Sequence, residues 1–222
     1  FDSSINCIVK HLESAGFQPE NSATGSLTYR IEERPLERPA WYPVDASLRL
    51  VGSNSTLLEY KTNHNMVAVN SHPTSPEGIT AEVVKIDRLE DLSEKSVKGK
   101  IVYGKMHPFI LYRSAVGDFG AAGVLTYEMP GYLKPEINQR SIQFRSIPYS
   151  DTLKGWSISL SYAAMQALDS SLENGRQKIH VKIDTRFVEA PERTVRSADY
   201  AGSRVRQEKG KRLSVPFYAP RR

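Results

Sequence analysis

The chain has 222 residues, of which 39% are hydrophobic and 25% are charged, an ordinary composition for a globular protein with its own core. No apolar run approaches the ~18 residues of a membrane-spanning helix. The N-terminal segment lacks the basic start and apolar stretch of a signal peptide. We therefore expect a soluble protein and leave its compartment open.

Cysteine chemistry is nearly excluded. Cys7 is the single cysteine, so neither an intramolecular disulfide nor a cysteine metal cluster is possible. Its place in a helical pattern predicts a small packed side chain and not a reactive thiol.

The formal net charge of +5 is concentrated near the C-terminus. Residues 196–222 contain eight Lys or Arg and two Asp or Glu, whereas residues 1–195 contain 22 basic and 23 acidic residues. The near-neutral body argues against a nucleic-acid partner, and no membrane partner is expected. We expect residues 191–222 to be a disordered or aberrant basic tail, with residues 196–222 outside the folded body. We interpret this tail as the product of a frameshifted or prematurely ended gene. The alternative is a genuine basic arm that binds an anionic surface.

The N-terminal 40 residues are expected to form one helix and a connector. Apolar residues at helical spacing predict a helix over residues 3–15, and Gly16 would end it. The connector contains one short strand at residues 27–31. Its Glu32–Glu33 pair lies in a charge-rich run, so we expect these two carboxylates to be solvated.

Short strands separated by Asn, Ser, Pro and Gly are expected from residue 41 to residue 87. Leu48 and Leu50 alternate with polar residues in the first strand. Residues 66–69 form a short apolar run, and residues 79–83 alternate again.

A strand–helix–strand unit is expected between residues 101 and 127, in the thirty or so residues typical of a parallel crossover. Residues 101–103 and 124–127 are the strands, and Pro108 begins the helix. Phe109, Tyr112, Val116 and Phe119 are expected on its inner face. The small residues 120–123 follow the helix, which favours close packing and argues against a phosphate loop.

The last expected elements run from residue 156 to residue 183. Residues 156–160 form a strand, and Ser161 caps a helix whose inner face carries Met165, Leu168 and Leu172. Alternating Ile179, Val181 and Ile183 predict a final strand.

The segment DLSEKSVKGKIVYG, followed by RSAVGDFGAAGVLTYE, resembles the core of protease-associated (PA) domains. Gly99, Gly120 and Gly123 are the glycines of these two segments. Pro148 lies in a later stretch that resembles the C-terminal half of the same domain. The resemblance covers roughly residues 41–190. It implies an α/β (α+β) fold, a PA-type β-sandwich or barrel-like domain with flanking helices.

Residues 1–40 resemble the edge of a zinc aminopeptidase domain, as in bacterial aminopeptidases and glutamate carboxypeptidase-like proteins that carry an inserted PA domain. In those relatives the inserted domain covers the active-site cleft and helps to shape it. The resemblance thus implies a lid, with a peptide or protein substrate as partner through the peptidase domain.

The same resemblance implies that catalysis and zinc belong to a part that follows the lid. Its ligand set begins with an H-x-D pair and ends with a late His. None of the five histidines here lies in that pattern, and none follows Val195. We therefore expect a truncated, inactive chain with no catalytic residue, metal ligand or cofactor of its own, and zinc only in the missing peptidase domain. His64 and His72 are expected to be solvent-exposed loop residues.

The loop from residue 129 to residue 145 is the candidate contact surface. Tyr132, Arg140 and Arg145 offer an aromatic ring and two guanidinium groups suited to carboxylates, although ordinary loop residues would look the same. Two other functions stay open. One is a stand-alone PA-type module that binds peptides or proteins, and the other is an anion-binding protein that uses the basic tail.

Overall fold

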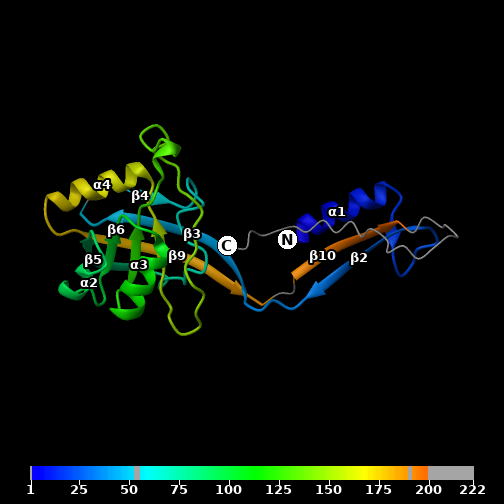
Figure 1. Ribbon diagram of the computed structural model, residues 1–222, viewed down its shortest axis with the longest axis horizontal. Coiled ribbons are helices and arrows are strands. Elements are labelled where there is room, and N and C mark those ends of the chain that lie inside the picture. Colours follow the sequence, from blue (N-terminus) through cyan, green and yellow to red (C-terminus); the bar gives the residue numbers. More distant parts are fainter. Residues whose placement is uncertain (1, 53–55, 190–191, 200–222) are drawn as a thin grey trace. The chain divides into compact units, whose positions relative to one another are not determined.

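The computed structural model describes residues 2–52, 56–189 and 192–199. The chain forms two compact units (Figure 1). Among the described residues, unit 1 combines residues 2–40 with residues 189 and 192–199, and unit 2 lies within residues 41–188. Two segments far apart in the sequence therefore share unit 1.

Unit 1 is a small sheet with one helix. Its elements are α1 (Asp2–Ser14), β1 (Gln18–Pro19), β2 (Leu27–Arg34) and β10 (Glu192–Asp199), with strand order β1-β2-β10. The predicted N-terminal helix is confirmed as α1, and Gly16 follows it with φ +90°, in the left-handed region that glycine tolerates. The packed position predicted for Cys7 is wrong, because this side chain lies on the exposed side of α1.

Strand β10 corrects the expectation of a disordered tail for residues 192–199. This strand pairs with β2 in an antiparallel ladder that runs from Glu192 opposite Arg34 to Asp199 opposite Leu27. Backbone pairing along β2 orders the segment although its side chains show no apolar period. Residues 200–222 lie outside the described residues.

Unit 2 contains a seven-stranded sheet with order β4-β3-β9-β5-β6-β7-β8. Strands β5 to β8 are parallel, while β3 pairs antiparallel with β4 and β5 pairs antiparallel with β9. Residues 66–69 make two isolated bridges and no regular strand. The predicted mixed α/β class is confirmed. The strands are β3 (Ala40–Leu50), β4 (Thr56–Glu59), β5 (Ile79–Ile86), β6 (Ile101–Gly104), β7 (Gly123–Thr126), β8 (Ser157–Ser159) and β9 (Lys178–Val188).

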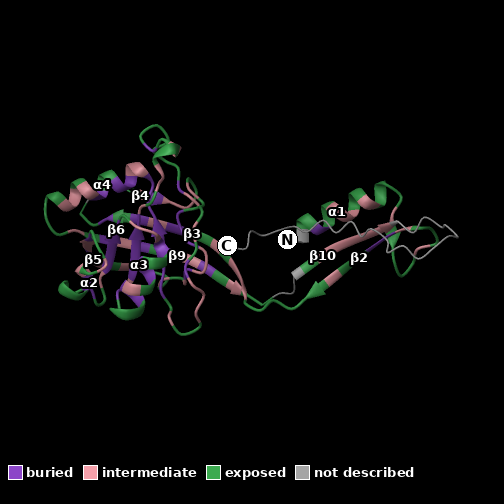
Figure 2. Cartoon of the chain, viewed as in Figure 1, coloured by how far each residue is buried: buried purple, intermediate pink, exposed green. Residues whose placement is uncertain are grey.

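Two apolar cores lie on opposite faces of the parallel strands, and Figure 2 shows much of β6 and α3 as buried. Along β6, Ile101 and Tyr103 enter the first core and Val102 enters the second, as the twofold alternation of a strand requires. Helix α4 (Tyr162–Glu173) covers the first core. The second is covered by α2 (Asp91–Glu94), α3 (Pro108–Tyr112) and the π-helical turn η1 (Arg113–Asp118).

The predicted crossover is confirmed, since β6, α3 with η1, and the parallel strand β7 follow one another. The predicted inner face is half wrong. Tyr112 and Val116 are buried, but Phe109 and Phe119 are exposed. The buried positions besides these two are Pro108, Leu111 and Ala115, so the inner stripe follows the i, i+3, i+4 spacing of one helix face.

The glycines of the PA-like motif have separate roles. Gly99 and Gly120 have φ of +71° and +68°, and the Gly99 N–H donates to the Gly120 carbonyl at 2.9 Å. Both positions therefore favour glycine. Gly123 has ordinary backbone angles but packs directly against the indole ring of Trp156. Pro148 is half-buried in the long loop before β8.

Candidate contact surface

The three predicted contact residues lie on one long loop of unit 2 but do not share one hollow. Tyr132, in the short 3-10 helix η2 (Gly131–Leu133), is 78% exposed. Arg140 lines a broad hollow beside β4, and Arg145 lines a different, much smaller one. The loop therefore presents separate features and not a single cluster.

Arg145 is held by its neighbours. One terminal nitrogen of its guanidinium lies 3.2 Å from a carboxylate oxygen of Glu128 and also donates to the side chain of Gln143. Its backbone carbonyl accepts a hydrogen bond from the Val69 N–H at 2.9 Å. Its guanidinium is therefore already engaged by neighbouring side chains, and its backbone ties the loop to residues 66–69.

The hollow beside β4 has a volume of about 370 Å³ and is open to solvent. Two hydrogen bonds fix the loop over it. Asn63 Nδ2 donates to the Arg140 carbonyl at 2.5 Å, and the Ala163 N–H donates to the Gln139 carbonyl at 3.0 Å. The lining residues come from β4, the turn after it, the loop and the start of α4: Thr56, Leu57, Leu58, Glu59, Thr62, Asn63, Arg140, Ser161 and Ala163.

Two opposite charges line this hollow without a partner. Neither the Glu59 carboxylate nor the Arg140 guanidinium forms an ion pair or side-chain hydrogen bond with any residue in the described part of the chain. Leu58 is buried and Leu57 half-buried, so the hollow also has an apolar wall. Unpaired charges of both signs beside apolar surface are suited to a ligand that itself carries both charges.

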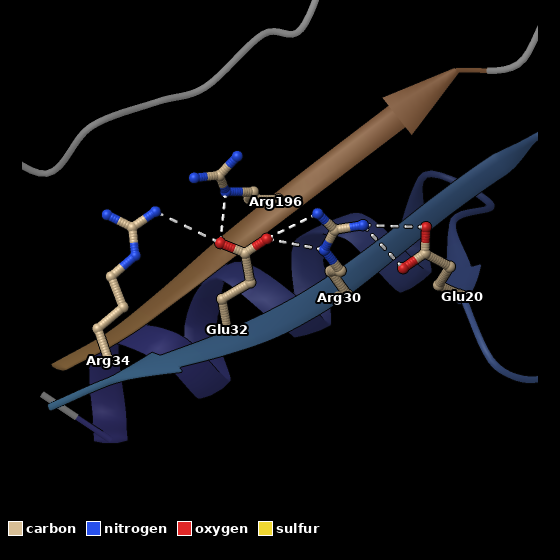
Figure 3. Close-up of polar contacts among 5 residues, drawn as sticks. All are labelled: Glu20, Arg30, Glu32, Arg34 and Arg196. Carbon is tan, nitrogen blue, oxygen red and sulfur yellow. Dashed lines mark hydrogen bonds and ion pairs between the residues drawn. The ribbon is translucent and has the colours of Figure 1, made fainter. Parts of the chain in front are cut away.

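The second cluster of charge lies on unit 1 and is internally paired (Figure 3). The Glu32 carboxylate lies 2.7 Å from a nitrogen of Arg30 and 2.7 Å from Arg196 Nε, and Arg30 also reaches Glu20 at 3.1 Å. Hydrogen bonds from Arg30, with the nearby charge of Arg196, lower the pKa of Glu32 despite partial desolvation. Glu32 thus belongs to a surface charge cluster, as expected, and the structure adds that its carboxylate is paired with arginines.

Glu33 is also paired, with Arg193 Nε at 2.8 Å. Carboxylates already engaged by arginines do not suit a zinc ion, which needs ligands free to coordinate it. Within the described ranges, no group of three or more His, Cys, Asp or Glu is arranged to hold a metal ion.

The two loop histidines differ. His64 is exposed and its ring lies 4.7 Å from that of Tyr60. His72 is half-buried, because its ring packs 4.7 Å from Phe187 and its Nε2 lies 3.1 Å from the Ser150 carbonyl. Solvent exposure was therefore correctly predicted for His64 and wrong for His72.

Sequence reasoning found Arg140 and missed Glu59. Strand β4 is only four residues long, so it gives almost no periodic signal. In the sequence, the polar run Ser53–Asn54–Ser55 before an apolar pair was the one available sign of a strand there. Glu59 comes close to Arg140 only in the tertiary structure.

No protein-family model matches the chain, and no curated protein sequence matches it either. None of the described helices is long and apolar enough to cross a membrane.

Solved peptidase structures share the fold. An aminopeptidase from Aneurinibacillus sp. matches 88% of this chain with TM-score 0.55 and 17% identity. A peptidase precursor from Shewanella amazonensis also matches 88%, with TM-score 0.55 and 14% identity. A zinc aminopeptidase from Bacillus subtilis matches 88% of this chain with TM-score 0.57 and 13% identity. The chain spans 41%, 44% and 40% of these proteins, respectively.

Proposed function

We propose that this chain is the non-catalytic PA-type lid portion of a zinc-dependent aminopeptidase-like metallopeptidase. Residues 41–188 are the lid. Unit 1 is the edge of the peptidase domain from which the lid emerges. The zinc ions and the catalytic groups belong to a peptidase domain outside this sequence, and the substrate is a peptide or protein.

The observation that carries the proposal is the extent of the fold match. Unit 2 is about two thirds of the chain, so a match over 88% includes much of unit 1 as well. Each of the three matched proteins, two named as aminopeptidases and one as a peptidase precursor, is more than twice as long as the matched part. A lid together with its attachment to a larger enzyme accounts for this pattern.

The proposal assigns no chemical step to this chain. The fully buried residues are mainly apolar, and the acidic pair Glu32–Glu33 is engaged by arginines. What the chain contributes is a surface that meets the substrate, at the hollow that contains Glu59 and Arg140. Substrate contacts of this kind affect which peptide is bound and how it is oriented.

A chimaera tests the proposal. Residues 41–188 replace the structurally matching segment of the Bacillus subtilis zinc aminopeptidase, and hydrolysis of a series of aminoacyl and peptidyl substrates is measured. We expect a zinc-loaded, active enzyme with an altered order of preference among substrates. The control replaces the same segment with a short Gly/Ser linker. A folded, zinc-loaded chimaera whose rates and preferences equal those of the linker control would contradict the lid role.

A further inference from the structure

We infer that the hollow beside β4 binds an extended peptide segment as an added strand, with a carboxylate of the peptide on Arg140 and a cationic group on Glu59. The inference rests on the proposed function only for its choice of a peptide as ligand. The hollow, its free strand edge and its two unpaired charges are features of unit 2 itself.

Strand β4 is the end strand of the seven-stranded sheet. It pairs with β3 on one side, with Ser47 opposite Glu59 and Leu48 opposite Leu58. Among the described residues, no strand pairs with its other side. Backbone N–H and C=O groups on a free edge are a template for an incoming strand. The Glu59 carbonyl is already engaged, since it accepts from the Thr62 and Asn63 N–H groups at 3.1 and 3.0 Å, so the peptide would pair with the remaining groups of β4.

The hollow coincides with this edge. All four residues of β4 line it together with Arg140 and the start of α4, and Figure 1 shows α4 beside β4. An extended segment placed beside β4 would therefore lie in a hollow that also contains Arg140 and Ser161. Its volume of about 370 Å³ falls in the range of small-ligand sites, which is roughly 300–1,000 Å³.

The charges of Arg140 and Glu59 indicate which kind of ligand the hollow would bind. A guanidinium group binds a carboxylate through two parallel hydrogen bonds, and a carboxylate binds an ammonium or guanidinium group. The N-terminus of α4 contributes little to this charge, because Ser161 Oγ accepts from the Ala164 N–H at 3.2 Å and Ala163 donates to the loop. Arg140 and Glu59 are thus the charged groups that a peptide would meet.

The peptide carboxylate has two possible sources, a free C-terminus or an acidic side chain. The probes are fluorescein-labelled hexapeptides of β-branched residues that carry one Lys and one carboxylate, separated by one, two or three residues. One arm has an internal Asp and an amidated C-terminus, and the other has a neutral interior and a free C-terminus. Binding to the full chain is followed by fluorescence anisotropy.

We expect at least one arm to bind with a Kd below about 1 mM, and Arg140→Gln and Glu59→Gln each to raise that Kd roughly tenfold, as expected for a lost charge-assisted contact. The matched controls are Arg113→Gln and Glu77→Gln, which remove the same groups from exposed positions outside the hollow. These controls should leave the Kd unchanged.

Backbone pairing has its own test. Alternate N–H groups of an extended peptide point to the same side, so N-methylation of one alternate set should abolish binding and N-methylation of the other set should not. Equal effects of both sets, or no binding by any probe, would overturn the inference. Self-association of the chain that blocks the probe would also overturn it, because the edge would then be occupied by a second copy. Since these measurements need no peptidase activity, their outcome is separate from that of the chimaera.

Discussion

Replacing Gly123 by Val tests the packing of the first core most directly. A Cβ atom at this position would lie 2.3 Å from Cε2 and 2.4 Å from Cδ2 of Trp156. These distances are more than 1 Å shorter than the ~3.5–4.0 Å of ordinary carbon contacts. Trp156 is only 2% exposed, so its ring has no free space to enter.

The expected loss in free energy of unfolding depends on how the core adjusts to the valine side chain at this position. Overpacking typically costs about 1–3 kcal/mol, and loss of the packing of a buried Trp costs about 3–5 kcal/mol. We expect a loss near 3 kcal/mol, because Val adds two further methyl groups to the clash. At ~2–4 °C per kcal/mol for a unit of this size, the melting temperature of unit 2 should fall by about 6–12 °C.

Thermal unfolding followed by near-UV circular dichroism is the assay, since the signal of Trp156 reports on the clash itself. Gly131→Val is the matched control, because a Cβ at that exposed loop position meets nothing within 4 Å. In a double-mutant cycle, Trp156→Leu should remove most of the cost of Gly123→Val. An unchanged melting temperature, or the same cost in both backgrounds, would refute the reasoning.

Three further outcomes are expected. Glu32→Gln should destabilise unit 1 at pH 7 and have a progressively smaller effect as the pH falls: the lowered pKa of Glu32 gives stability that is present above its unfolded value of 4.5 and is lost as the pH falls through the folded value. Urea unfolding over a series of pH values from 7 downward, with Glu37→Gln as control, measures this difference, and an effect that stays constant over the whole series would contradict it. Ser161→Ala should cost about 1 kcal/mol through loss of the N-cap of α4, whereas Ser170→Ala on the same helix should not; equal melting temperatures would argue against the cap. After dialysis the full chain should retain no zinc and hydrolyse no aminoacyl chromogenic substrate; stoichiometric zinc by elemental analysis would contradict this.

Local patterns in the sequence were sufficient to predict the elements that have a regular apolar alternation or clear capping residues. Alternation at Ile179, Val181 and Ile183 gave β9, whose three side chains are all buried. Ser161 and Gly175 bracket α4 as capping chemistry requires, since Ser161 Oγ accepts from a first-turn N–H and Gly175 has φ +121°.

Patterns failed where the sequence carried no local signal. Strand β10 is rich in charge and has no apolar alternation, and it exists because β2 offers a backbone edge from a segment more than 150 residues earlier. Cys7 is a different case: it lies two positions after Ile5, off the stripe of Ile5, Val9 and Leu12 that the helical period turns inward, so its exposure agrees with the pattern.

The sequence by itself determined the class of fold and the crossover around β6 and β7, and it singled out Arg140 as a candidate contact residue. Only the tertiary structure decided that Glu59 lies in the same hollow as Arg140, that Arg145 is held by Glu128, and that Glu32 is paired with the distant Arg196. The physical reason is the distance along the chain between the interacting residues. Hydrogen bonds within a helix or a turn join near neighbours, whereas pairing between strands and between charges joins residues that chain order leaves far apart.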